Sequence, residues 1–190
     1  TALAYPDYSH LDQAMSQLGA QGSPTQGFSA WVNNLPLGVL FVLFAVGVLR
    51  RLRGSRLALL SAGLILVHGL ASFATGYFPC DQGCAPVQPS FSQQMHNLAG
   101  LVMFLSLTLA SLLWAFASKR LMGARGFGLF SLACTVLAVA TVVLMAQAVE
   151  TGHSFGLYQR INYGISVIWV AGLALMLSRS RAGALQPGAT

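Results

Sequence analysis

This chain contains few charged residues, and acidic residues are the scarcest. Its 190 residues include four Asp and Glu and ten Lys and Arg, so that 7% of the chain is charged, whereas 55% is hydrophobic. Soluble domains usually carry roughly 25% charged residues. With a mean hydropathy of +0.67, the chain is too apolar for a soluble domain of its size, and its composition indicates an integral membrane protein.

Familiar catalytic and metal-binding motifs are also missing. The sequence has neither an HExxH zinc motif nor a GxSxG nucleophile motif, and Ser9 is better explained as a helix cap than as an attacking hydroxyl. It therefore gives no reason to expect a metal or a cofactor. The isoelectric point near 9.8 does not require a nucleic-acid partner, because the basic residues lie in short loops beside apolar segments.

What the sequence does contain is long apolar segments. Each of five segments approaches the roughly 20 residues that a helix needs to cross the hydrocarbon of a bilayer, and no soluble domain is inserted between them. They predict an all-α, polytopic bundle of transmembrane helices that forms a single membrane domain over residues 1–190. The five predicted spans are about 31–49, 57–78, 98–117, 127–149 and 158–177.

The few charges are sorted along the chain. Nine of the ten basic residues fall in three stretches, which alternate with the four acidic residues. Because basic loops tend to stay on the cytoplasmic side, the sorting places the N-terminus of this chain outside and its C-terminus in the cytoplasm. The basic stretches are Arg50, Arg51, Arg53 and Arg56, then Lys119, Arg120 and Arg125, then Arg179 and Arg181. The predicted external segments are 1–30, 79–96 and 150–157, and the predicted cytoplasmic tail is 178–190.

Aromatic residues near the ends of the predicted spans support this orientation. Trp31, Tyr77 and Tyr158 lie at predicted outer ends, and Trp114 lies near an inner end, as expected for residues that prefer the membrane interface. Trp169 lies well inside the last span and is therefore expected to pack among the helices.

The predicted external segment 1–30 contains a helix signal. Ser9-x-x-Asp12 is a variant of the capping box, and Gly19 is a suitable helix stop. We therefore expect a short interfacial helix near residues 9–18, with its apolar side chains on one face. This helix either shields the ends of the spans or forms one wall of a binding site.

The cysteines also point to an external loop. Cys80 and Cys84 lie four positions apart after the second span, where the compartment is oxidising, so we expect a disulfide that shapes the turn. A redox-active pair is the alternative, although the spacing is not C-x-x-C. Cys134 lies inside a predicted span and is most simply a packing residue.

Several short motifs, taken together, resemble a known family. They are Tyr5-Pro6-Asp7-Tyr8-Ser9-His10-Leu11, Ser16-Gln17-Leu18-Gly19-Ala20 with Pro24, Phe78-Pro79-Cys80-Asp81-Gln82-Gly83-Cys84 followed by His96, and Gln159-Arg160-Ile161. In this combination the chain resembles the bacterial membrane proteins called domain of unknown function 998, over nearly its whole length. The resemblance implies a multi-pass protein of the bacterial inner membrane with six helices, so that a further span is expected upstream of residue 1. It assigns no function.

Most of the reactive side chains are predicted to lie outside. Arg160, the one basic residue beyond the three basic stretches, lies about one turn into the last span, where an unpaired cation is costly. We expect it to pair with a carboxylate or to bind an anion such as a lipid phosphate. His68, near the middle of the second span, is either packed and hydrogen-bonded or an intramembrane functional site. The candidate external site comprises Asp7, His10, Asp81, His96, Glu150 and Arg160.

Three classes of function remain. The favoured class is non-catalytic: an accessory subunit of other membrane proteins, or a module that binds membrane lipids or anions through a polar external cap. The alternative is a membrane-embedded enzyme for a lipid or lipid-linked substrate, in which His10 or His96 acts as a base or metal ligand and Arg160 binds a phosphate. Those three side chains would then have to converge. A redox or haem protein is disfavoured, because His68 and His96 are predicted at different depths.

Overall fold

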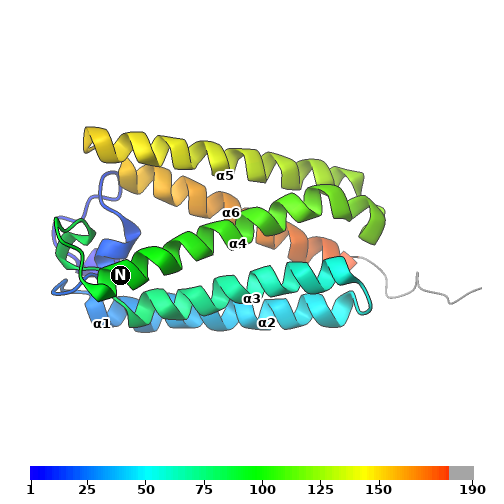
Figure 1. Cartoon of the computed structure of the whole chain (residues 1–190), viewed down its shortest axis with the longest axis horizontal. Helices are drawn as coiled ribbons and strands as arrows, with labels where there is room; N and C mark the ends of the chain where they lie inside the picture. The colour runs from blue at the N-terminus through cyan, green and yellow to red at the C-terminus, as the bar shows by residue number, and fades with distance from the viewer. Residues whose placement is uncertain (180–190) are drawn as a thin grey trace, which may run out of the picture.

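The computed structural model describes residues 1–179, and every regular element in that range is a helix. Five long helices run along the long axis of the molecule (Figure 1). All five are long and apolar enough to cross a membrane, which confirms the predicted all-α fold with five spans. The first is the continuous helix Gln26–Arg51, made of α1 (Gln26–Ser29), the π-helical turn η3 (Ala30–Asn34) and α2 (Leu35–Arg51); the others are α3 (Arg56–Tyr77), α4 (Phe91–Met122), α5 (Arg125–Thr151) and α6 (Phe155–Arg179). From residue 180 onward, the predicted cytoplasmic tail lies outside the residues that the structure describes.

The helices extend past the apolar runs from which they were predicted, because polar capping signals set their ends. The longest, α4, begins after Ser90, whose Oγ accepts a hydrogen bond from Gln93 N at 3.1 Å. It ends at Gly123, which adopts a left-handed φ of 66° that glycine tolerates without strain. The rule of about 20 apolar residues therefore locates a span but not the full length of its helix.

Consecutive helices pack against each other in the order α2, α3, α4, α5, α6. Two fully buried tryptophans occupy the core: Trp114 Nε1 donates to Ser61 Oγ at 2.7 Å, and Trp169 Nε1 donates to Ser131 Oγ at 3.0 Å. The packing predicted for Trp169 is confirmed. The interfacial position predicted for Trp114 is wrong, because its indole N–H reaches a small polar partner on α3 inside the bundle.

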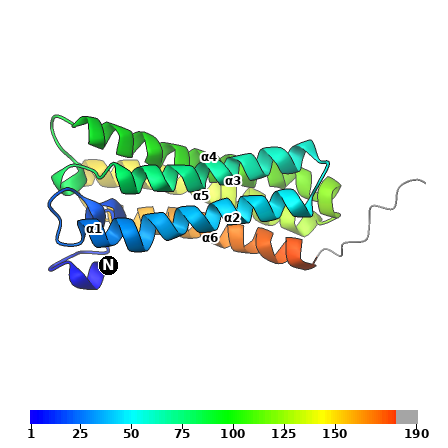
Figure 2. The same ribbon diagram turned by 90° about the horizontal axis from the view of Figure 1, so that it is seen from below.

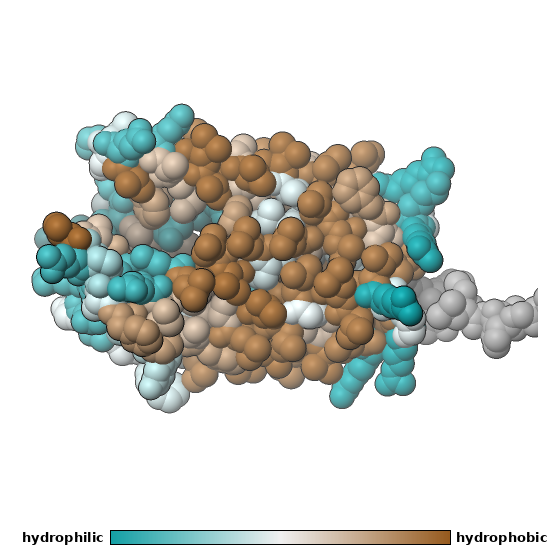
Figure 3. Space-filling model, in the orientation of Figure 1, coloured by the Kyte–Doolittle hydropathy of each residue, from teal (hydrophilic) through white to brown (hydrophobic). Residues whose placement is uncertain are grey.

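The first and last spans also meet. Near their C-terminal ends, Arg51 Nε of α2 donates to Leu177 O of α6 at 3.0 Å, and Figure 2 shows both helices ending at the same end of the molecule. We call this end of the bundle the basic end, because the basic residues of the described chain other than Arg160 lie at it. The opposite end is the cap end, formed by residues 1–25 (the cap) and by the turns that join α3 to α4 and α5 to α6. Apolar side chains cover the middle of the molecule between two hydrophilic ends (Figure 3).

The short helix expected near residues 9–18 is divided into two parts. One hydrogen-bonded turn starts at Ser9, and the 3-10 helix η2 follows at Met15–Gly19. Between them, Met15 N donates to Gln159 Oε1 of α6 at 2.7 Å. A continuous α-helix would need that N–H for its own i−4 carbonyl. Contacts with α6 therefore replace the regular helix, and the cap follows the surface it covers.

Candidate functional site

A cavity of about 770 Å³ lies under the cap, between all five spans. Its size falls within the roughly 300–1,000 Å³ that is usual for small-molecule sites. Polar side chains gather at its cap end, and apolar side chains dominate further in. The lining includes His10, His96, Gln159 and Arg160 near the cap and His68 and Tyr163 deeper in the cavity. Leu37, Leu40, Gly100, Met103, Phe104 and Val142 line the remaining walls.

Arg160 fastens the cap to α6. Its Nη1 group donates to the carbonyl oxygens of His10 at 2.7 Å, Gln13 at 3.1 Å and Gly156 at 2.8 Å. Its Nη2 group donates to Tyr8 Oη at 2.6 Å. Among residues 1–179, no carboxylate forms a salt bridge with it. The expected carboxylate partner is therefore replaced by backbone carbonyls, whose dipoles solvate the guanidinium without neutralising its charge.

The phenol that binds Arg160 does not neutralise it either. Burial raises the pKa of Tyr8 above its ordinary value of 10.0, and the hydrogen bond from Arg160 offsets this only in part. Tyr8 therefore stays a neutral phenol at physiological pH, and its ring centroid lies 5.6 Å from Arg160 Cζ. The site keeps a full positive charge.

Arg160 also keeps hydrogen-bond donors for a ligand. A guanidinium has five N–H groups, and the three carbonyls share the pair on Nη1 while Tyr8 takes one on Nη2. The Nε–H and the second Nη2–H have no acceptor within the described part of the chain. The free Nε–H lies on the Nε–Nη2 edge, the side of a guanidinium that can bind a carboxylate or phosphate in a bidentate manner. Charge and free donors together make Arg160 a candidate for anion binding.

His10 and His96 share the cavity with Arg160, but the three side chains form no mutual hydrogen bond. His96 lies within 2.8 Å of Phe78 O through Nδ1, and because a carbonyl only accepts, Nδ1 carries the proton. Its Nε2 has no partner in the described structure. The exposed His10 ring packs edge-on against Tyr8 at 5.2 Å. The three side chains therefore share one cavity without direct hydrogen bonds between them.

A second polar pair lies deeper. His68 is 1% exposed and also lines the cavity. Its Nδ1 lies 3.0 Å from Met103 O, and its Nε2 lies 3.5 Å from Tyr163 Oη. Phe41 packs on the imidazole at 4.2 Å between ring centroids. His68 is thus packed and hydrogen-bonded, and it also lines the cavity.

The three acidic residues of the predicted site do not line the cavity. Asp81 accepts hydrogen bonds from Ser90 Oγ at 2.5 Å and Ser90 N at 2.9 Å, which lower its pKa below the ordinary value. It thereby orders the start of α4. Asp7 is exposed at a left-handed φ of 57°, and Glu150 is exposed near the end of α5. The six predicted external residues therefore separate into two groups: His10, His96 and Arg160 line the cavity, and the three acidic residues lie outside it.

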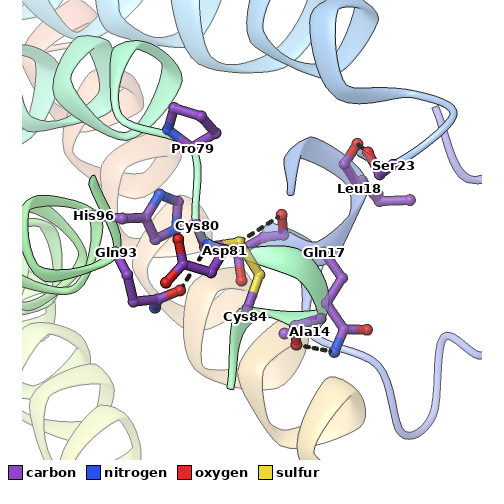
Figure 4. The surroundings of a disulfide bond; sticks show 12 residues. Ala14, Gln17, Leu18, Ser23, Pro79, Cys80, Asp81, Cys84, Gln93 and His96 are labelled. Carbon is purple, nitrogen blue, oxygen red and sulfur yellow. Dashed lines mark hydrogen bonds between the residues drawn. A yellow bond between two sulfur atoms is a disulfide. The ribbon is translucent and has the colours of Figure 1, made fainter. Parts of the chain in front are cut away.

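The predicted disulfide lies beside the cap. Cys80 and Cys84 are at disulfide distance, with Cα atoms 5.0 Å apart, and Figure 4 shows them between the cap and the start of α4. Gln21 N donates to Cys80 O at 2.8 Å, and Gln17 Nε2 donates to Gly83 O at 2.8 Å. The cross-linked turn thus supports the cap from the α3–α4 side. Cys134 is buried in the bundle as a free thiol, as predicted.

Sequence reasoning missed three contributors to the site: Tyr8, Gln159 and Tyr163. Tyr8 lies close to His10 in the sequence, and Gln159 directly precedes Arg160. The contact of Tyr8 with the Arg160 guanidinium and that of Gln159 with the backbone of Met15 form only in the folded protein. Tyr163 carried a usable signal, because it lies three positions after Arg160 and therefore on the same face of a helix. Polar residues aligned with an intramembrane arginine indicate one continuous polar wall.

Asp12 links the cap to the α5–α6 turn in a way that depends on pH. Its carboxylate accepts from Ser154 N at 2.9 Å and from Ser9 Oγ at 3.0 Å, and these bonds lower its pKa. The folded-state pKa thus lies below the unfolded value of about 3.9. The stabilisation is present above that value and is lost as the pH falls through the folded-state pKa.

We expect Asp12→Asn to lower the Tm at pH 7, and the difference from wild type to shrink below about pH 4. Thermal unfolding from pH 7 to pH 3 measures this, and a constant difference would contradict it.

Comparison with known proteins identifies the family. A search of curated proteins and a search of solved structures found no match. The family model described as "Protein of unknown function (DUF998)" matches residues 1–176. That range includes the cap, the cross-linked turn, Arg160 and nearly all of α6. The chain therefore belongs to the DUF998 family.

Proposed function

We propose that this protein binds an anionic amphiphile, with the anionic group at Arg160 and the apolar part in the cavity beneath the cap. The observation that carries the proposal is an uncompensated guanidinium with free donors on the wall of a cavity of about 770 Å³. A cation at such a position gains most from a ligand that supplies the missing negative charge. A phosphate group fits both the charge and the bidentate edge.

The lining of the cavity favours an amphiphile as the ligand over a small soluble anion. Leu37 and Leu40 of α2, Val142 of α5 and Phe104 of α4 all line it. Apolar walls stabilise a bound ligand in proportion to the apolar surface that the ligand and the walls bury against each other. A free phosphate would bury none of that surface. The combination of one charged end and apolar walls is typical of a lipid site.

Binding without catalysis agrees with the chemistry of the lining. Arg160 is engaged with the backbone, and His10 and His96 form no hydrogen bond with each other or with a serine or cysteine nucleophile in the described structure. General acid–base catalysis needs such groups within hydrogen-bond reach of the reacting atoms. The arrangement holds a charge in place, which is what a binding module requires.

We further propose that the cap end faces outward and the basic end faces the cytoplasm. The positive-inside rule supports this orientation, because Arg50, Arg51, Arg53, Arg56, Lys119, Arg120 and Arg125 all lie at the basic end. The ligand would then belong to the outer leaflet.

Filling the cavity tests the proposal. Gly100 of α4 lines it, and a Cβ added there meets no atom within 4 Å. Gly100→Leu should leave the fold intact but occupy the ligand's space. Overpacking of roughly 1–3 kcal/mol corresponds to about 5- to 150-fold weaker binding. Native mass spectrometry of gently extracted protein measures the fraction that carries a bound phospholipid.

Gly164 of α6 provides the matched control. A Cβ at this position also meets nothing within 4 Å, but Gly164 does not line the cavity. Gly164→Leu should therefore keep wild-type lipid occupancy. Equal occupancy in wild type, Gly100→Leu and Gly164→Leu would show that the lipid is bound elsewhere and would reject the proposal.

A further inference from the structure

We infer that the ligand is an ester-linked glycerophospholipid, whose phosphate binds Arg160 and whose ester carbonyl accepts a hydrogen bond from Tyr163. This inference rests on the proposed function and names the class of lipid. It follows from the polar pair formed by Tyr163 and His68, which a ligand with a purely hydrocarbon body would leave without use.

The order of the two polar points matches that class of lipid. Arg160 and Tyr163 lie three positions apart on α6, on one face of the helix, and both line the cavity. Tyr163 lies further from the cap end, where α6 begins. In a glycerophospholipid, the glycerol carbons place an ester carbonyl a few bonds from the phosphate. The two protein groups therefore follow each other from the cap inward in the same order as the phosphate and the ester carbonyl of the ligand.

Tyr163 has a hydroxyl that lacks a strong acceptor. The contact with His68 Nε2 is 3.5 Å long, at the outer limit for a hydrogen bond, whereas hydroxyl donors prefer about 2.7–2.8 Å. His68 Nδ1 donates to Met103 O, so the neutral ring has Nε2 as its acceptor and cannot move toward Tyr163 without losing that bond. The O–H of Tyr163 is thus free to turn toward a ligand carbonyl.

The same pair argues against other anionic amphiphiles. A fatty acid, an alkyl phosphate or a polyprenyl phosphate continues as hydrocarbon directly after its anionic group. With such a ligand, the hydroxyl of Tyr163 would face hydrocarbon and keep only its long contact with His68, and a buried donor with so weak a partner weakens binding. An ester carbonyl at this depth satisfies the hydroxyl instead.

Paired probes that differ in one carbonyl test the inference. We would titrate the purified full chain with 1-oleoyl-glycerol-3-phosphate and with its 1-O-alkyl ether analogue, which has the same charge but lacks the carbonyl. Wild type should bind the ester about 3- to 10-fold more tightly, the value of one hydrogen bond. Tyr163→Phe should bind both probes equally, at the wild-type affinity for the ether. Tyr158→Phe, on the same helix but outside the cavity, should keep the preference for the ester.

Each contrary result has a separate meaning. Equal ester and ether affinities in wild type, or an ester preference that survives in Tyr163→Phe, would overturn the ester inference while leaving the proposed function. Failure of wild type to bind either phosphate lipid more tightly than uncharged 1-oleoylglycerol would overturn the proposed function itself. If Tyr163→Phe does not fold, the wild-type comparison of the two phosphate probes still decides the inference.

Discussion

Arg160→Met is expected to detach the cap from α6. The variant leaves the carbonyls of His10, Gln13 and Gly156 and the Tyr8 hydroxyl without their shared donor. Hydrogen bonds to charged groups contribute about 1.5–3 kcal/mol each and are not additive. We therefore expect the free energy of opening the cap to fall by roughly 3–5 kcal/mol. Hydrogen–deuterium exchange of residues 8–17 should accelerate accordingly, while exchange in the core of the spans stays slow.

Two further variants serve as controls for the Arg160→Met result. Arg125→Met removes an exposed arginine at the basic end and should leave exchange in the cap unchanged. Arg160→Lys keeps the charge but loses the planar group that reaches several acceptors at once, so an intermediate rate is expected. Wild-type protection of the cap in Arg160→Met would show that other contacts, such as those of Asp12, Met15 and the disulfide-linked turn, hold the cap in place.

Gly69→Leu is expected to separate α2 from α3. A Cβ at Gly69 would lie 2.9 Å from Gly38 O and 3.2 Å from Val42 N, both of them backbone atoms of α2. Backbone atoms cannot move aside as a side chain can, so the helices must separate. Overpacking at such a site costs on the order of 3 kcal/mol. Thermal unfolding in detergent should show a clearly lower Tm.

Gly63 of α3 supplies the control on the same helix, since a Cβ there meets nothing within 4 Å. Gly63→Leu should unfold close to the wild-type temperature. Equal Tm values for the two variants would mean that α2 and α3 do not approach each other closely at Gly69.

The spans were predictable and the cap was not, for a physical reason. A run of apolar residues such as 127–149 indicates a span by itself, because every backbone group in a membrane helix is satisfied within the helix. The cap, by contrast, depends on hydrogen bonds to distant parts of the chain. Met15 N donates to the Gln159 side chain, and the Asp12 carboxylate accepts from Ser154 N. No local pattern in the sequence specifies partners that lie more than a hundred positions away.

The sequence drew attention to Arg160 but did not indicate which groups its side chain contacts. The position of Arg160 inside a span identified the key residue, because a lone cation there demands an explanation. Its partners could not be predicted, since carbonyl groups exist at every residue and leave no trace in the sequence. Trp114 was misplaced for a related reason: the hydroxyl of Ser61 that receives its N–H is found only when α3 and α4 are packed.

The bonds that fasten the cap also set an order of events during synthesis. The ribosome makes the His10 carbonyl 150 positions before the Arg160 side chain that binds it. Until α6 has emerged and entered the bundle, the carbonyls of His10 and Gln13 lack their Arg160 partner, although the α3–α4 turn can already support the cap from its other side. The α6 side of the cap is therefore completed only after all the earlier spans have been made, and a chain truncated before α6 would lack that side.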